Sequence, residues 1–235
     1  MKDSYWLKSG AYSLFQRLSV VLFGFAGFYI LIRVFSKEQF GVWMLFISVT
    51  AFLEVVRIGL IKNAALKYIV SSSYDEKPKV LSAVLFLNVV ITVILGAVLF
   101  FGSQYLARTW DAPELEFLLK LYILPLFIYI FFYHFEYIQQ ANFNFQGSFI
   151  TNFTKQGLFL LYILFFFFSN QEFSLVNLAV AQIFTIVVAT IISFFITKKY
   201  LQFKWVFQRD WINKIFHFGK YTFGTNISTM LFGNI

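Results

Sequence analysis

The sequence predicts an all-α integral membrane protein. Of its 235 residues, 60% are hydrophobic and only 13% are charged, whereas about a quarter of the residues of a soluble domain are charged. The mean hydropathy is +0.74, and most charges fall between long apolar runs rather than within them. This pattern is typical of membrane-spanning helices joined by short polar loops. It leaves no room for a separate extramembrane catalytic domain.

Six apolar runs are long enough to cross a bilayer, because 20 to 25 residues of helix cover about 30 to 37 Å. They comprise residues 11–32, 40–61, 80–101, 116–138, 150–169 and 173–197. The first run is too long for a signal peptide, and Gln16 and Arg17 interrupt it. We therefore expect it to remain as the first helix.

Two local signals refine the third connection and the fourth span. Asp111 and Glu114 stand three residues apart before an apolar run, which predicts that Asp111 caps the N-terminus of a helix. Pro125 lies near the middle of the fourth run. A proline there removes one backbone hydrogen bond, so we expect a kink in that span.

The distribution of Lys and Arg predicts the orientation. With a cytoplasmic N-terminus, twelve of these residues lie on the inner side, and only Arg33, Lys37 and Arg108 lie on the outer side. Membrane proteins keep their basic loops in the cytoplasm. The net charge of +8 is therefore explained by topology, and no nucleic-acid partner is expected.

A long-range repeat links the two ends of the chain. The segment Gly10–Gly24 aligns without a gap to residues 219–233, with matching Gly, Tyr, Ser, Leu, Phe and Gly positions at an offset of 209 residues. Six predicted helices separate the two copies, so both enter the membrane from the same side. Parallel repeats of this kind are a common plan of secondary transporters, although two apolar segments can also align by chance.

The opening of the chain resembles a known family. The segment from Gly10 to Leu31, the following Arg33-Val-Phe-Ser-Lys-Glu-Gln-Phe-Gly41-Val-Trp, and the segment Arg57-Ile-Gly59 to Tyr68 are similar to the first two helices of Wzx-type polysaccharide flippases. These belong to the multidrug/oligosaccharidyl-lipid/polysaccharide (MOP) exporter superfamily. The resemblance implies two six-helix lobes around a central cavity that opens alternately to either face.

Length distinguishes the chain from such a two-lobed transporter. We expect residues 1–197 to form a six-helix N-terminal lobe and residues 198–220 to form a cytoplasmic amphipathic linker. Residues 221–235 would begin the second lobe, because fifteen residues of helix reach only about 22 Å and cannot cross a bilayer. The rest of that second lobe is a partner that this sequence lacks. A half-sized transporter that dimerises is the alternative.

The resemblance implies a cargo with a large anionic headgroup, an oligosaccharide on a polyprenyl diphosphate. Cations at membrane depth suit such a headgroup, and Arg matches phosphate oxygens best. Arg17, Arg57 and Lys155 lie about 6 to 9 Å inside the cytoplasmic ends of three predicted spans, by the helical rise. Charges inside a membrane usually face a protein interior, so we assign all three to substrate binding. Snorkelling of these side chains to the interface is the alternative.

Glu54 precedes Arg57 by three positions, so the two share a helix face and are expected to form an ion pair. Alternatively, Glu54 binds a coupling cation or proton. Four amides also fall within the spans, where such groups usually join helices: Gln16, Asn88, Gln156 and Gln182. The sequence has no cysteine, no metal-ligand spacing and no nucleophile beside a base, so neither an enzyme nor a cofactor is expected.

Three functions remain open. The first is translocation of a lipid-linked oligosaccharide across the bacterial cytoplasmic membrane, for surface polysaccharides such as the O-antigen of lipopolysaccharide. The second is cation-coupled multidrug export, and the third is a non-transporting, truncated membrane protein. The excess of cations over carboxylates within the spans favours the first. Besides the cargo, membrane lipids are the expected partners.

Overall fold

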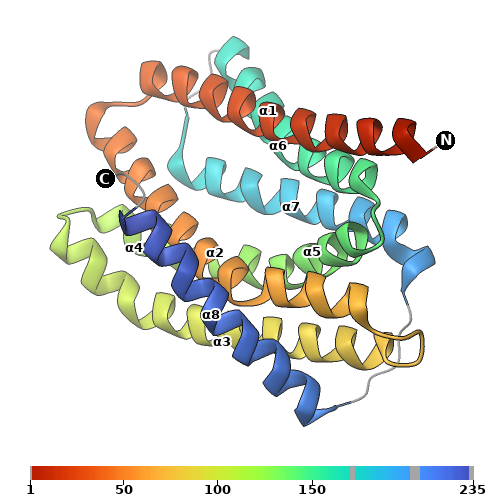
Figure 1. Ribbon diagram of the computed structural model, residues 1–235. Coiled ribbons are helices and arrows are strands. Elements are labelled where there is room, and N and C mark those ends of the chain that lie inside the picture. Colours follow the sequence, from red (N-terminus) through yellow and green to blue (C-terminus); the bar gives the residue numbers. More distant parts are fainter. Residues whose placement is uncertain (1, 170–172, 202–206, 233–235) are drawn as a thin grey trace.

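The computed structural model describes residues 2–169, 173–201 and 207–232, and within these ranges the side chains of residues 8–225. The described ranges contain helices and no strand (Figure 1). The elements are α1 (Lys2–Val34), α2 (Lys37–Ser71), α3 (Lys77–Thr109), α4 (Pro113–Leu121), α5 (Ile123–Ala141), α6 (Phe145–Ser169), α7 (Leu175–Thr197), the 3₁₀ helix η1 (Lys198–Tyr200) and α8 (Arg209–Phe232).

The predicted all-α membrane fold is confirmed. Six segments of the described chain are long and apolar enough to cross a membrane. They are Lys8–Val34, Lys37–Ser71, Lys77–Thr109, Pro113–Ala141, Phe145–Ser169 and Leu175–Tyr200. Each contains one predicted apolar run apart from a residue or two at the ends, and the fourth consists of α4 and α5 in succession.

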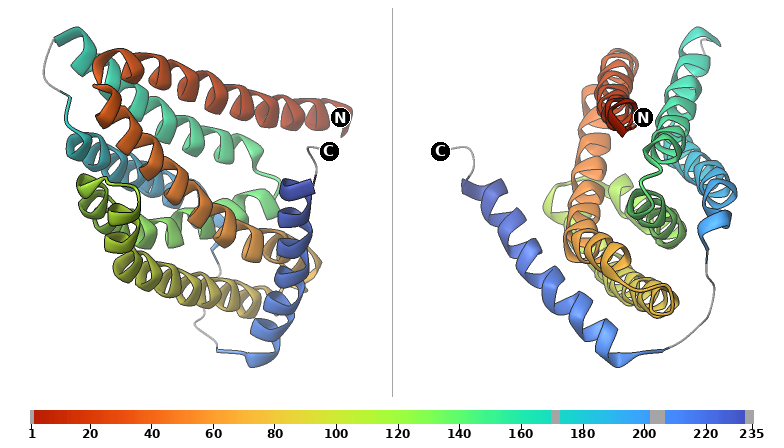
Figure 2. Two further views of the ribbon diagram at one scale, coloured as in Figure 1. Left: turned by 90° about the vertical axis from the view of Figure 1, so that its left-hand side faces the viewer. Right: turned by 45° about the vertical axis from the view of Figure 1, so that its right-hand side comes forward.

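The helices form two groups that share α5. On one side α1 packs against α6, and α6 packs against α7; on the other, α2 and α3 pack together and α8 lies across both (Figure 1). Helix α5 contacts α7 of the first group and α2 and α3 of the second. Helix α1 barely touches α2 apart from their connection, so the two groups diverge (Figure 2).

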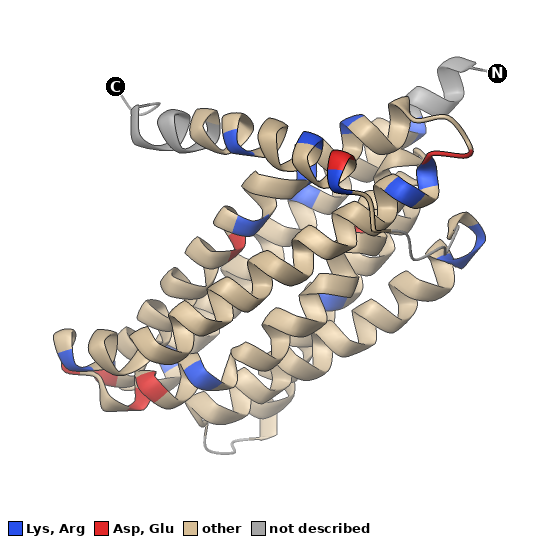
Figure 3. Cartoon of the chain, turned by 90° about the horizontal axis from the view of Figure 1, so that it is seen from below, with Lys and Arg blue, Asp and Glu red and all other residues tan. Residues whose placement is uncertain are grey.

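The outer surface of the bundle is suited to lipid. Large apolar side chains are exposed along the long helices, including Phe25, Phe101, Phe165 and Phe168. Charged residues gather at the two ends of the bundle, and the stretch between them is almost free of charge (Figure 3). An apolar band of this kind between two polar ends can face hydrocarbon without unpaired polar groups.

The predicted kink of the fourth span is present as a break between α4 and α5. Pro125 has no N–H to donate to the carbonyl of Leu121, and its ring would clash with that carbonyl in a regular helix. Helix α4 accordingly ends at Leu121, and Tyr122 has ψ of −14° before α5 begins. The Tyr122 side chain at this break is buried.

The prediction that Asp111 caps a helix N-terminus is wrong. Pro113 fixes the first position of α4, so Ala112 is the N-cap, and no side chain bonds there. Asp111 instead terminates α3 with a left-handed φ of 49°. Its N–H bonds the Arg108 carbonyl, and the Ala112 N–H bonds the Ala107 carbonyl, which is the Schellman arrangement at a helix C-terminus.

Helix α8 crosses α2 at very close range. A β-carbon built on Gly219 would lie 1.9 Å from the carbonyl oxygen of Leu60, and the Thr222 hydroxyl donates to the Gly59 carbonyl at 3.4 Å. The helix is continuous through residue 220, where we predicted a boundary between linker and second lobe. Part of the predicted linker, including Lys204, lies outside the described residues.

Candidate substrate-binding cavity

A cavity of about 430 Å³ lies between α1, α2, α5, α6 and α7. Most of its lining is apolar, and several aromatic rings contribute, among them Phe23 and Phe28 of α1, Trp43 of α2 and Phe159 of α6. The polar side chains on its wall are Thr50, Glu54, Tyr122, Tyr129, Lys155, Gln156, Gln182 and Thr185. Small-molecule sites have this composition: an apolar cavity with a few converging polar groups.

Glu54 is held on the cavity wall by Arg57, one turn further along α2. The Arg57 Nη2 donates to both carboxylate oxygens at 2.6 Å. The Nη1 donates to the Leu126 carbonyl of α5 at 3.0 Å and approaches the Thr92 hydroxyl of α3 at 3.4 Å. Arg57 is fully buried, so its guanidinium joins three helices and neutralises Glu54 from the protein side of the wall.

The break between α4 and α5 supplies a second contact to Glu54. The Tyr122 hydroxyl donates to Glu54 Oε1 at 3.0 Å. Tyr122 lies in this turn, three residues before Pro125. Both carboxylate oxygens of Glu54 therefore accept hydrogen bonds from Arg57 or Tyr122. Arg57 compensates the negative charge of Glu54, so no cation from a ligand in the cavity is needed.

The ring of Tyr129 lies close to both the buried cation and a second one. The Arg57 guanidinium is 5.2 Å from its centroid, and Lys155 Nζ is 5.3 Å from it. Lys155, on α6, also lies 4.9 Å from the ring of Phe132. In the described part of the chain the ion pairs are Arg57–Glu54 and Lys120–Glu116, so Lys155 contacts aromatic faces but no carboxylate. Such contacts stabilise a cation without neutralising it.

The cavity therefore carries one uncompensated positive charge. Glu54 and Arg57 cancel one another, and Lys155 and Glu54 are the two charged residues among the lining residues. A cavity with this balance attracts an anionic group. The described residues contain no group of three His, Cys, Asp or Glu side chains that could hold a metal ion.

Comparison with known proteins identifies the family. The family model described as polysaccharide biosynthesis protein matches residues 30–235. The chain belongs to the polysaccharide biosynthesis protein family. No curated protein matches the sequence.

Solved structures confirm the fold expected for such a polysaccharide biosynthesis protein. An outward-facing multidrug resistance transporter of the MATE family and MOP superfamily matches with a TM-score of 0.80 at 16% identity. A MOP superfamily transporter from Pyrococcus furiosus, described by the reverse polarity of its binding pocket, matches equally well, and a MATE transporter in a straight conformation has a TM-score of 0.78 at 15% identity. Each match covers 96% of this chain and 53% of the other. The chain thus has the fold of a MOP-type transporter and spans about half the length of the transporters that it matches.

Of the three predicted substrate-binding cations of this polysaccharide biosynthesis protein, the structure brings two together. Lys155 lines the cavity, and Arg57 lies behind the wall, with the ring of Tyr129 near both cations. Arg17 is exposed on α1 and is not among the lining residues. The preceding residue, Gln16, is the one that contacts α6, through the Ser148 hydroxyl at 3.5 Å.

The sequence did not identify the two tyrosines of the site, and it predicted another role for two of the amides that line the cavity. Tyr122 and Tyr129 are two of 48 Phe and Tyr residues, and only the proximity of Tyr122 to Pro125 could have singled one out. Gln156 and Gln182 line the cavity, whereas we expected them to join helices. That role belongs to Gln139, whose amide donates to the Ser193 hydroxyl of α7 at 3.0 Å.

A second buried carboxylate lies at the far end of α5. Glu136 is 6% exposed, and its Oε1 accepts hydrogen bonds from Gln140 at 3.0 Å, from Ser148 at 3.3 Å and from Asn152 at 3.1 Å. Ser148 and Asn152 belong to α6, so this cluster fastens α5 to α6. No ion pair involves Glu136 in the described part of the chain.

Proposed function

We propose that the complete transporter moves a lipid-linked oligosaccharide across the bacterial cytoplasmic membrane for surface polysaccharide synthesis, and that Lys155 binds the anionic phosphate of its cargo. The observation that carries the proposal is the charge balance of the cavity. Glu54 is neutralised by Arg57 from behind, and Lys155 is the cation that faces the cavity without a carboxylate partner. Family membership supports a saccharide cargo.

The dimensions of the cavity limit what this lobe holds. A volume of about 430 Å³ is at the lower end of the range for small-molecule sites, so an oligosaccharide of several units exceeds it. We propose that the lobe binds the phosphate end of the cargo, and that the sugars extend toward the second lobe. The apolar rings beside Lys155 would contact the adjoining part of the prenyl chain.

In this proposal residues 1–197 act as the N-terminal lobe, residues 198–220 as the cytoplasmic connection, and residues 221–235 as the start of the second lobe. The N-terminus lies in the cytoplasm, as the bias of basic residues predicts. Arg57 acts on the cargo indirectly, by neutralising Glu54. Arg17 stays a predicted substrate contact, and its exposed position on α1 would require contact with a part of the cargo outside this cavity.

The test uses the full-length transporter in a strain that lacks its own copy. Lys155→Gln removes the charge, and we expect export of surface polysaccharide to fall about tenfold at an unchanged protein level, because a charge-assisted hydrogen bond contributes about 1.5–3 kcal/mol. Lys155→Arg keeps the charge and should retain most activity. The control is Lys62→Gln on α2, which removes the same charge away from the cavity.

Full export by Lys155→Gln at a normal level in membrane immunoblots would refute the assigned role of Lys155. The same variants tested for growth in toxic organic cations address the alternative function, cation-coupled drug export. If Lys155→Gln raised drug resistance in this strain while saccharide export was absent even with the unmodified protein, the drug exporter would replace the flippase as the conclusion.

A further inference from the structure

A second, smaller cavity of about 140 Å³ lies where the ends of four elements meet. Its walls come from the end of α2, the first turns of α3, the end of α5 and the 3₁₀ helix η1. It shares no lining residue with the substrate-binding cavity. It lies at the end of the bundle that we predict to be cytoplasmic, since the α2–α3 loop and the segment after residue 197 are both inner segments.

Two lysines from different helices converge on this cavity. Lys77 is the first residue of α3, Lys199 belongs to η1, and no carboxylate is among the lining residues. Neither lysine takes part in an ion pair of the described residues. Asn142 and Tyr200 also line the cavity. The Asn142 amide uses one hydrogen for the Ile138 carbonyl at 2.8 Å, which leaves its second hydrogen for a ligand.

Several carbonyl groups at the helix C-termini beside the cavity accept hydrogen bonds, so they repel an anion less than free carbonyl groups would. The last carbonyls of α5 are occupied, since the Gln139 and Gln140 carbonyls accept the N–H groups of Asn144 and Phe143. The Tyr68 carbonyl near the end of α2 accepts from both the N–H and the hydroxyl of Ser72. Asp75 and Glu76 stand just before Lys77 but do not line the cavity, so the charges on its wall are the two unpaired lysines, which favour an anion there.

The remaining wall of the cavity is apolar. Ile69, Leu81 and Ile138 are buried side chains that form this part of the lining. The volume is below the roughly 300 Å³ of typical small-molecule sites, so the cavity suits a single compact group rather than a saccharide. Two unpaired ammonium groups above an apolar wall match a phosphate group with a short apolar extension.

From this arrangement we infer that the cavity is a phosphate-binding site at the cytoplasmic end of the bundle, in which Lys77 and Lys199 hold the phosphate of an anionic phospholipid or a free phosphate ion. The site is separate from the proposed substrate cavity and does not depend on the proposed cargo. A bound phosphate would join η1 to the start of α3, two elements that are more than a hundred residues apart.

The chain offers a matched internal control for each lysine. Lys79 is two residues from Lys77 on α3, and Lys198 is next to Lys199 in η1, yet neither lines the cavity. The full-length protein is acylated with a lysine-specific reagent in detergent micelles that contain phosphatidylcholine alone, phosphatidylcholine with phosphatidylglycerol, or phosphatidylcholine with inorganic phosphate. Mass spectrometry then gives the rate at each lysine.

We expect phosphatidylglycerol to slow acylation of Lys77 and Lys199 by about tenfold, and that of Lys79 and Lys198 by less than about twofold. Protection by phosphatidylglycerol alone identifies a lipid headgroup as the ligand, and protection by inorganic phosphate as well identifies a site for the free ion too. Equal protection of all four lysines, or of none, would overturn the proposal.

Variants provide a second measurement that does not depend on labelling. The double change Lys77→Gln/Lys199→Gln should weaken binding of phosphatidylglycerol, measured by native mass spectrometry, by about a hundredfold, because each charge-assisted hydrogen bond to the phosphate contributes about 1.5–3 kcal/mol. The control Lys79→Gln/Lys198→Gln removes the same charge from the same two elements and should weaken binding by less than about threefold. Equal losses in both pairs would show general surface attraction and contradict the site.

Discussion

Gly219 of α8 lies directly against the carbonyl oxygen of Leu60 in α2, so close that a β-carbon on residue 219 would stand 1.9 Å from that oxygen. The neighbouring atom is backbone, which cannot rotate away as a side chain can. Only glycine fits at this crossing. The contact fixes where α8 passes over α2, and therefore the direction in which the chain leaves the six spans.

Gly219→Ala should consequently destabilise the protein by about 1–3 kcal/mol, or push α8 away from α2. Gly224→Ala is the matched control, because no atom lies within 4 Å of a β-carbon there and alanine is the better helix former by up to about 1 kcal/mol. Thermal unfolding of the purified transporter compares the two. A Gly219→Ala protein that unfolds at or above the temperature of Gly224→Ala would contradict the close crossing.

Arg57→Ala should sharply lower the amount of folded protein, since it leaves Glu54 without its cation, at a cost of about 3–5 kcal/mol for a broken buried pair. The double change Glu54→Ala/Arg57→Ala should restore much of the protein level, because no carboxylate then remains unpaired. Arg57→Lys keeps the charge but cannot reach both Glu54 and the Leu126 carbonyl, so an intermediate level is expected. Membrane immunoblots measure all three.

Transport by that double variant separates the two roles considered for Arg57. Because Arg57 lies behind the cavity wall, we expect a double variant at normal level to keep substantial export of surface polysaccharide. A normally expressed but inactive double variant would instead show that Arg57 or Glu54 acts directly in transport, as the sequence alone suggested. Export of surface polysaccharide is measured by the assay described for Lys155→Gln.

Phe143→Gly should stabilise the protein. Phe143 terminates α5 with a left-handed φ of 56°, a conformation that costs a non-glycine residue about 1–2 kcal/mol. Its side chain is half exposed, but its ring contacts that of Phe145, with centroids 6.4 Å apart. Loss of this contact offsets part of the relief, so the expected gain is up to about 1 kcal/mol in the free energy of unfolding. Phe145→Gly is the control, because that residue starts α6 with no left-handed backbone. A lower unfolding temperature for Phe143→Gly than for the unchanged protein would argue against this account.

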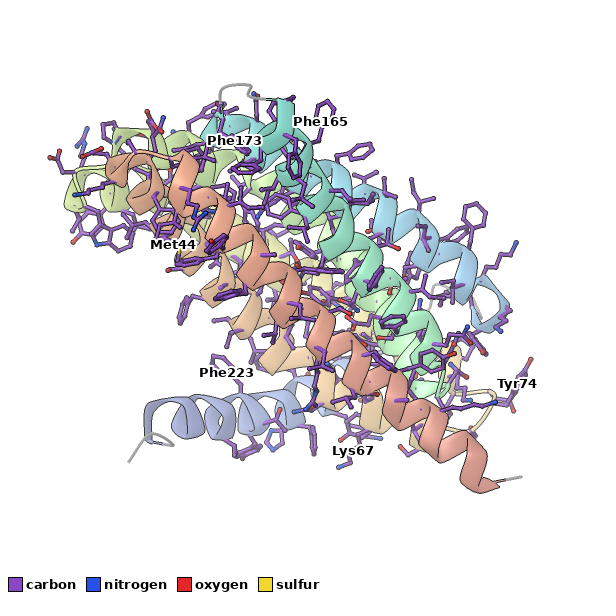
Figure 4. The ribbon with its side chains drawn as sticks, turned by 90° about the horizontal axis from the view of Figure 1, so that it is seen from above. Met44, Lys67, Tyr74, Phe165, Phe173 and Phe223 are labelled. Atoms are coloured by element: carbon purple, nitrogen blue, oxygen red, sulfur yellow. The ribbon has the colours of Figure 1, made fainter. Side chains whose placement is uncertain are left out.

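The orientation is tested with single cysteines, which the chain otherwise lacks. Tyr74→Cys lies in the α2–α3 loop, where the side chain points away from the bundle (Figure 4), and should react only with a membrane-permeant reagent in intact spheroplasts. Thr109→Cys at the opposite end of α3 should react with an impermeant one. Lys67, which lies beside α8 with its Nζ 4.1 Å from the ring of Phe218 (Figure 4), belongs to the same end of the bundle as Tyr74. The reverse reactivity at either cysteine would overturn the topology.

The sequence predicted the spans well, because hydropathy over about 20 residues reports a property of each helix alone. It also predicted the Glu54–Arg57 pair, since a three-residue spacing places both on one helix face. It could not show that Arg17 faces outward while Gln16 faces α6. That difference of one residue depends on how α1 is rotated against its neighbour, and helix rotation is set by packing between helices.

The cluster around Glu136 has a consequence for motion. It fastens α6 to α5 at one end, whereas further along α6 the contacts across the cavity involve aromatic rings: Lys155 lies against Tyr129 and Phe132, and Phe159 stacks on Trp43, each contact amounting to about 1–2 kcal/mol. The Arg57 bonds lie wholly among α2, α3 and α5. Helix α6 also packs against α1 and α7, and Gln139 fastens α7 to α5 near the same end as Glu136. We therefore predict that α1, α6 and α7 move together about that end, widening the cavity at its opposite end while the buried ion pair stays intact.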